Sequence, residues 1–175
     1  SAVVIEDKIG TKKNSLFKDQ TGIKQDSIKN FCKKIIKAKE SKISDDFLII
    51  ARIESFILGK NIDDAIKRAE SYSRAGADAI LIHSKEKNAN QIFSFSKEFK
   101  KSKFFKPLIA VPSTYSKTYE RELIDNGFKI VIYANHFLRA LHPAIVDVAK
   151  MILKNQRSFE AEKKISSISE VINLF

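Results

Sequence analysis

Several features that commonly mark a function are absent from these 175 residues. A single cysteine, Cys32, excludes an internal disulfide and a zinc site built from several cysteines. The Gly-x-Gly-x-x-Gly fingerprint of dinucleotide-binding folds and the glycine-rich phosphate loop of nucleotide hydrolases do not occur. No apolar run approaches the roughly 20 residues that cross a bilayer, and no signal peptide opens the chain, since Glu6 and Asp7 come early. The sequence therefore predicts a soluble, cytoplasmic protein without a membrane partner.

Acidic residues are few relative to basic ones, at 21 against 32, and the net charge is +11. Such an excess is compatible with a nucleic-acid partner. The lysines, however, are scattered over the faces of presumed helices, and arginine, which dominates the recognition of base edges, is a minority of the basic residues. We therefore expect no nucleic-acid partner, and an attraction for small anionic substrates stays open.

Five apolar, β-branched runs predict strands covered on both faces, because each run is nearly continuous rather than alternating. These runs are residues 2–5, 47–53, 79–82, 108–111 and 130–133. Amphipathic stretches with helical spacing lie between and after them. The predicted helices are residues 26–39, 62–75, 88–101, 117–126, 138–155 and 168–175. A strand–helix order repeated five times predicts an α/β fold with a parallel sheet.

Polar residues follow the apolar runs at the carboxyl ends of the predicted strands. They are Glu6, Arg52 with Glu54, His83 with Ser84, Ser113 with Thr114, and Asn135 with His136. This edge carries the active site of a (β/α)8 barrel, and an open parallel sheet also binds ligands there. Five polar strand ends fit one shared barrel mouth better. No linker rich in glycine or proline divides the chain, so we expect one domain over residues 1–175.

Arg52 stands inside an apolar run, LIIARIESF, where a guanidinium is unfavourable unless a charge meets it. One interpretation is structural, with Glu54 supplying that charge two residues later. The other is functional, because strand alternation places both side chains on the same face, at the barrel mouth. There the planar fork of arginine suits a phosphoryl or carboxylate group. We favour the functional interpretation.

His83 ends the third apolar run. A histidine at such a place is either a hydrogen-bonded core residue or a donor to a developing oxyanion, and Arg52 on a neighbouring strand favours the second interpretation. His136 is interpreted as a rim residue and His142 as a structural residue of the last long helix. Without His-x-x-x-His spacing a zinc site is not expected. Glu6 is the carboxylate placed to support a magnesium ion, through water.

The segment at residues 3–17, VVIEDKIGTKKNSLF, passes from an apolar run into lysines, one glycine and Asn14–Ser15. It has two interpretations. It is either a solvated basic turn between a strand and a helix, or a mobile loop over a strand end, where lysine and asparagine meet a charged substrate.

The pattern EDK…K-x-N-S within this segment resembles the gating loop of the phosphoenolpyruvate mutase family, in the isocitrate lyase superfamily. The blocks ARIESFILGK, AESYSRAGADAILIHSK, AVPSTY and VIYANHFLRA also resemble that family, in the same order. The resemblance runs through most of the chain. It implies a (β/α)8 barrel of the TIM type and a magnesium-dependent conversion between phosphoenolpyruvate and phosphonopyruvate, in phosphonate biosynthesis.

The resemblance also implies roles for single residues. Lys12 and Asn14 match loop residues that close over the substrate, and Ser15 stands beside them as a further substrate contact. Arg52 and His83 match residues that hold the transferring phosphoryl group, and Glu6 an acidic residue near the metal. These roles agree with the chemistry, because a metaphosphate-like group needs positioning and donors more than a protein nucleophile.

Two departures from the family pattern limit the prediction. A full barrel takes roughly 250 residues, so we expect the last five strand–helix units, with the first three and their magnesium-binding aspartates absent. The Lys-Lys-Cys-Gly-His loop of related carbon–carbon lyases is missing, which disfavours that activity.

Phosphonopyruvate hydrolase remains the alternative enzyme, although Lys12-x-Asn14-Ser15 favours the mutase. A catalytically incomplete fragment is an alternative of another class. By the same resemblance we expect a homo-oligomer.

Overall fold

The structure is a computed structural model that describes residues 1–11, 13–17 and 19–174. The chain forms two compact units, Ser1–Tyr133 and Ala134–Phe175. Lys12, which the sequence assigns to the substrate loop, lies outside the described residues. The prediction of one domain over residues 1–175 stays a prediction.

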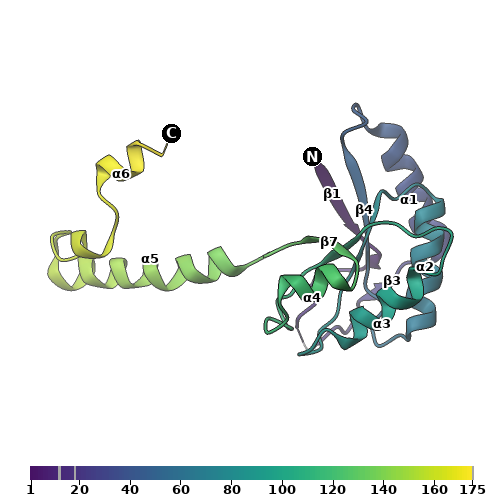
Figure 1. Ribbon diagram of the computed structural model, residues 1–175. Coiled ribbons are helices and arrows are strands. Elements are labelled where there is room, and N and C mark those ends of the chain that lie inside the picture. The colour runs from purple at the N-terminus through teal and green to yellow at the C-terminus, as the bar shows by residue number, and fades with distance from the viewer. Residues whose placement is uncertain (12, 18, 175) are drawn as a thin grey trace. The chain divides into compact units, whose positions relative to one another are not determined.

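The first unit is built on a five-stranded parallel sheet (Figure 1). Its strands are β1 (Ala2–Glu6), β4 (Leu48–Ile53), β5 (Ala79–Ile82), β6 (Leu108–Ala110) and β7 (Phe128–Val131), and they lie side by side in sequence order. All neighbouring pairs are parallel. This confirms the strand prediction, except that β7 begins two residues earlier than the run at 130–133 indicated.

A second, two-stranded sheet was not expected from the sequence. β2 (Lys8–Ile9) pairs antiparallel with β3 (Lys24–Gln25). The pairing joins the two ends of the polar segment that follows β1, so this segment is a loop with a closed base. Gly10 supports the turn out of β2, because its φ of 103° suits glycine and an added Cβ would lie 2.7 Å from the Gly22 carbonyl oxygen.

Four helices follow the strands within the first unit and end close to their predicted boundaries. They are α1 (Ile28–Ser41), α2 (Ile62–Arg74), α3 (Asn90–Phe99) and α4 (Glu120–Asp125). The Ser27 hydroxyl accepts the Asn30 N–H at 3.1 Å and caps α1, which decides between Asp26 and Ser27 as the cap. Gly76, with φ of 107°, follows the last turn of α2, as the sequence indicates.

The two faces of the sheet differ in what covers them. Buried residues of all four helices form one apolar cluster with Ile49, Ala51 and Ile53 of β4 and their counterparts on β5 and β6. The alternating residues of the same strands form a separate small cluster that contains no helical residue. Its buried members are Ile50, Ala79, Leu81, Ile109 and Val111. Helices on one face only are typical of a barrel wall, whereas a doubly wound sheet carries them on both faces.

The second unit consists of α5 (His136–Asn155), a 3-10 turn η1 (Glu162–Lys164) and α6 (Ile168–Ile172). None of the residues of α5 is buried. An apolar groove of about 440 Å³ runs along it, lined by Leu141, Ala144, Ile145, Val148, Ala149, Ile152, Lys164 and Ile165. No helix among the described residues is long and apolar enough to cross a membrane.

The outer strands of the five-stranded sheet leave apolar residues exposed. Val3 and Val4 of β1 are 37% and 40% exposed, and Ile130 of β7 is 43% exposed. Because unpaired strand edges invite association, we expect the isolated 175-residue chain to self-associate or to be poorly stable. Light scattering and calorimetry test this expectation. A monodisperse monomer that unfolds cooperatively would contradict it.

Candidate active site at the carboxyl ends of the strands

Three side chains that the sequence singled out share the carboxyl edge and one face of the sheet. Glu6 of β1 and Arg52 of β4 are register partners, and Arg52 in turn lies beside Leu81 of β5. Side chains alternate along a strand, so Arg52 follows Ile50, and His83 follows Leu81, onto the face without helices. The strand ends thus bring Glu6, Arg52 and His83 together.

Arg52 and Glu54 form the ion pair that the structural interpretation required. The Arg52 Nε donates to Glu54 Oε1 at 2.5 Å, and Glu54 is 0% exposed. This contact occupies one of the five N–H donors of the guanidinium, and the side chain stays 21% exposed. Burial tends to raise the pKa of Glu54, but the charge of Arg52 and the hydroxyl of Ser15 hold it below its ordinary value.

The loop contributes two residues to the same cluster. The Ser15 hydroxyl donates to Glu54 Oε2 at 2.5 Å and accepts from Arg52 Nη2 at 2.9 Å. The Lys8 Nζ donates to the same hydroxyl at 2.8 Å and lies 3.3 Å from Glu54 Oε2. The loop is therefore folded onto Arg52, which agrees with a loop over a strand end better than with a solvated turn. Lys8 was not singled out by the sequence.

Asn14 lies differently from its neighbour Ser15. It is exposed, and its Oδ1 accepts the Leu16 N–H at 2.9 Å in a local turn. Its main-chain carbonyl accepts from Gln20 Nε2 at 3.0 Å. The side chain is therefore held in the loop beside the buried Ser15, and its contact with a substrate stays a prediction.

His83 is buried at the end of β5 with an exposed fraction of 3%. Its Nδ1 has no hydrogen-bond partner among the described residues. Burial lowers the pKa of His83 to about 4, and the positive charge of Arg52 acts in the same direction. At neutral pH the imidazole is therefore uncharged, and it can present either a donor or an acceptor to a group in the site.

This depressed pKa predicts a pH-dependent stability. The unfolded chain binds a proton at His83 near pH 6.5, whereas the folded chain does so only near pH 4. The contribution is therefore present above about pH 6.5 and is lost as the pH falls through 4, by about 3 kcal/mol at most. Urea unfolding at several pH values should show a steeper loss in the wild type than in His83→Gln. If the wild type and His83→Gln lost stability equally with falling pH, the loss could not be attributed to His83. Glu54 is present in both proteins, so its contribution cancels in the comparison.

A second buried network lies beneath the loop, and the sequence did not predict it. Asp7 is 0% exposed, and its Oδ2 accepts from the Tyr72 hydroxyl at 2.7 Å, from Gln25 at 2.9 Å and from Arg68 Nη1 at 3.2 Å. Burial raises the pKa of Asp7 and these contacts oppose the rise. One signal was available: Arg68 shares a helix face with Ala65, Ala69 and Tyr72, so it needed a buried partner.

Glu6, at the carboxyl end of β1, is the residue that the sequence assigned to a role beside a metal ion. Its Oε2 lies 3.9 Å from Arg52 Nε, and its side chain is 26% exposed. Among the described residues no group of three or more His, Cys, Asp and Glu side chains could hold a metal. Magnesium keeps several waters and takes one or two carboxylates. The described residues therefore do not make a complete magnesium site by themselves, and the role of Glu6 beside a metal stays a prediction.

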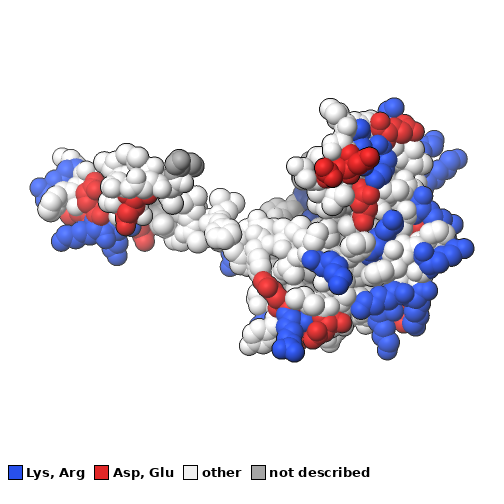
Figure 2. Space-filling model, turned by 45° about the horizontal axis from the view of Figure 1, so that its top comes forward, with Lys and Arg blue, Asp and Glu red and all other residues white. Residues whose placement is uncertain are grey.

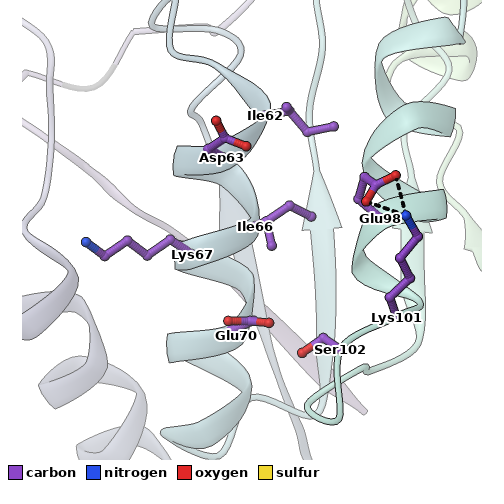
Figure 3. A pocket seen from close by; sticks show the side chains of 8 residues that line it. All are labelled: Ile62, Asp63, Ile66, Lys67, Glu70, Glu98, Lys101 and Ser102. Atoms are coloured by element: carbon purple, nitrogen blue, oxygen red, sulfur yellow. Dashed lines mark hydrogen bonds and ion pairs between the residues drawn. The ribbon is translucent and has the colours of Figure 1, made fainter.

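Several cavities elsewhere in the first unit do not include Arg52 or His83 among their lining residues. One of about 380 Å³ lies on the helical layer between α2 and α3 (Figure 3), where Glu98 pairs with Lys101. Another, of about 620 Å³, lies between the end of the loop and the turn after β4, with Lys24, Lys60 and Lys85 among its lining residues. In the view of Figure 2, basic side chains occupy several separate parts of the surface. The strand ends remain the candidate active site.

Comparison with known proteins decides the family. The family model described as phosphoenolpyruvate phosphomutase matches residues 1–153. The chain belongs to this family. A phosphoenolpyruvate phosphomutase of Tetrahymena pyriformis is 38% identical over 176 residues, which cover 99% of this chain and 57% of the relative. The resemblance that the sequence motifs indicated is thereby confirmed.

Solved structures of the family agree with the fold. The crystal structure of a phosphoenolpyruvate phosphomutase from Streptomyces platensis subsp. rosaceus matches with a TM-score of 0.89 at 38% identity, over 99% of this chain and 58% of that one. A phosphonopyruvate hydrolase in complex with oxalate and Mg²⁺ matches with a TM-score of 0.84 at 34% identity, with the same coverage. The chain thus spans less than two thirds of these relatives, and its five parallel strands are part of a TIM-type barrel.

Proposed function

We propose that a full-length protein containing this chain is a phosphoenolpyruvate mutase, which moves a phosphoryl group between the enolate oxygen of phosphoenolpyruvate and carbon 3 of phosphonopyruvate. The observation that carries the proposal is the position of Arg52. Its guanidinium is fixed by Glu54 and Ser15 but stays 21% exposed, on the face where His83 and Glu6 also lie. Family membership gives this geometry its chemical class.

The proposed roles follow from the donors available. Arg52 and the neutral His83 hold the phosphoryl oxygens, where charge is spread in the loose transition state. Lys12 and Asn14 close over the substrate with the loop. Ser15 takes part as a further contact through its main chain, because its hydroxyl is engaged by Glu54, Lys8 and Arg52. Glu6 supports Mg²⁺ through water. The metal ion, when bound, would neutralise part of the negative charge of the substrate. The magnesium complex of the hydrolase relative supports this metal.

Asn14→Ala is expected to discriminate between the two enzyme activities. The exposed amide of Asn14 stands in the loop beside Ser15. If it guides the phosphoryl group back to the enolate oxygen, its loss should lower formation of phosphoenolpyruvate from phosphonopyruvate by about 10²-fold. The measurement is the rate of product formation by phosphorus NMR. An unchanged rate would remove Asn14 from the mechanism.

The alternative is phosphonopyruvate hydrolase, which the hydrolase relative at 34% identity supports. The same assay separates the two enzymes, because a hydrolase releases phosphate and pyruvate and forms no phosphoenolpyruvate. A third outcome, no turnover by the 175-residue chain with Mg²⁺ but turnover by the full-length protein, would identify this chain as a catalytically incomplete part. Removal of Mg²⁺ by EDTA should abolish turnover in either enzyme, and its return should restore it.

The proposal includes the cellular setting. We expect a cytoplasmic homo-oligomer acting on a small molecule, without nucleic-acid or membrane partners. The apolar groove along α5 and the absence of buried residues in that helix support self-association. Sedimentation of the full-length protein tests the oligomeric state.

A further inference from the structure

Glu54 connects the loop to Arg52. Its Oε1 accepts from Arg52 Nε, while its Oε2 accepts from the Ser15 hydroxyl, 39 residues earlier in the chain. Lys8 at the base of the loop lies 3.3 Å from the same Oε2. A side chain that is 0% exposed thus holds the arginine with one oxygen and the loop with the other.

The Ser15 hydroxyl has no hydrogen-bonding capacity left. A hydroxyl donates once and accepts twice. Ser15 donates to Glu54 and accepts from Lys8 at 2.8 Å and from Arg52 Nη2 at 2.9 Å. Withdrawal of Ser15 would therefore remove one partner from Glu54 and one from Arg52 at the same moment.

The base of the loop is fixed independently of Ser15. The Asp26 N–H donates to the Asp7 carbonyl at 2.8 Å, and Arg68 Nη1 reaches the Asp26 carbonyl at 2.8 Å. The Asp7 Oδ1 also accepts the Glu54 N–H at 2.9 Å. The two ends of the loop are therefore held by contacts that do not involve Ser15, and Ser15 is the buried contact between the segment that joins them and the strand ends.

We propose that Ser15 and Glu54 form a latch that couples closure of the loop to the orientation of Arg52. Glu54 is then a positioning residue that acts through Arg52, and closing the loop completes the set of contacts on the guanidinium. The consequence for turnover rests on the proposed function. The latch itself does not, because the contacts exist whatever reaction the full-length protein performs.

Limited trypsin digestion of the full-length protein tests the latch, with cleavage after Lys13 as the measure of loop opening. Loss of a hydrogen bond to charged groups should raise the cleavage rate in Ser15→Ala about tenfold or more. Glu54→Gln should do the same, and the double variant should add little to either. Thr11→Ala, which removes an exposed hydroxyl of the same loop, should be cleaved at the wild-type rate. A peptide of residues 9–22 with each change corrects for effects on trypsin itself.

Two outcomes would overturn the latch: cleavage of Ser15→Ala at the wild-type rate, or fully multiplicative effects in the double variant. Unchanged circular dichroism of each variant makes a changed rate a property of the loop. In an active protein, Ser15→Ala should lower kcat more than it raises KM, because Arg52 acts mainly in the transition state. If digestion gave the expected result but the full-length protein had no mutase activity, the proposed function would be refuted and the latch would stand.

Discussion

Arg52→Ala should lower the turnover of the full-length protein by about 10²–10³-fold, the usual effect of removing one donor to a charge that develops in the transition state. The fold should survive. Without Arg52, Glu54 still has Lys8 at 3.3 Å and the hydroxyl of Ser15 at 2.5 Å. The buried carboxylate therefore keeps a positive charge and a donor, which limits the loss of stability.

Steady-state kinetics and urea unfolding of the same preparations check this result. Arg121→Ala is the matched control, because Arg121 is an exposed arginine of α4. The control should retain wild-type kcat and stability. If Arg52→Ala lost activity only in proportion to the fraction unfolded, Arg52 would be structural, and the ion pair with Glu54 would be its whole role.

The elements of the sheet could be predicted from the sequence because their signals are local. Nearly continuous apolar runs and helical spacing lie within windows of a few residues, and tertiary contacts then agreed with them. The start of α1 shows the limit. Asp26 and Ser27 are both good caps, and the choice fell to Ser27 because Asp26 is buried and its carboxylate pairs with Lys34 at 2.7 Å.

The pairings that shape the site could not be predicted in the same way. Ser15 and Glu54 are 39 residues apart, and Asp7 and Tyr72 are 65 residues apart. The local sequence around each of these residues does not indicate which distant residue it contacts. The sequence did indicate that Arg52 needed a charge, and Glu54 supplies it, as the structural interpretation required. The functional interpretation of Arg52 stays a prediction. The pair holds the arginine, and its side chain stays 21% exposed.

The Asp7–Arg68 pair beneath the loop carries the largest expected effect on stability. Both side chains are nearly inaccessible, at 0% and 5% exposure. Removing one partner of a buried ion pair leaves the other charge uncompensated, which typically destabilises a protein by about 3–5 kcal/mol. Arg68 also donates to Asp64 at 2.9 Å and to the Asp26 carbonyl at 2.8 Å. Arg68→Ala should therefore lower the free energy of unfolding by at least this amount.

Urea unfolding of the full-length protein at pH 7 measures the loss. Arg74→Ala on the same helix is the matched control; it removes an exposed arginine stacked on Phe104 and should cost less than about 1 kcal/mol. Adding Asp7→Asn to Arg68→Ala should recover part of the loss, because the double variant no longer buries an unpaired carboxylate. If Asp7→Asn instead deepened the loss by its full individual effect, the two residues would act independently. The base of the loop would then depend on the hydrogen bonds of Asp7 to Tyr72 and Gln25, and not on its charge pair with Arg68.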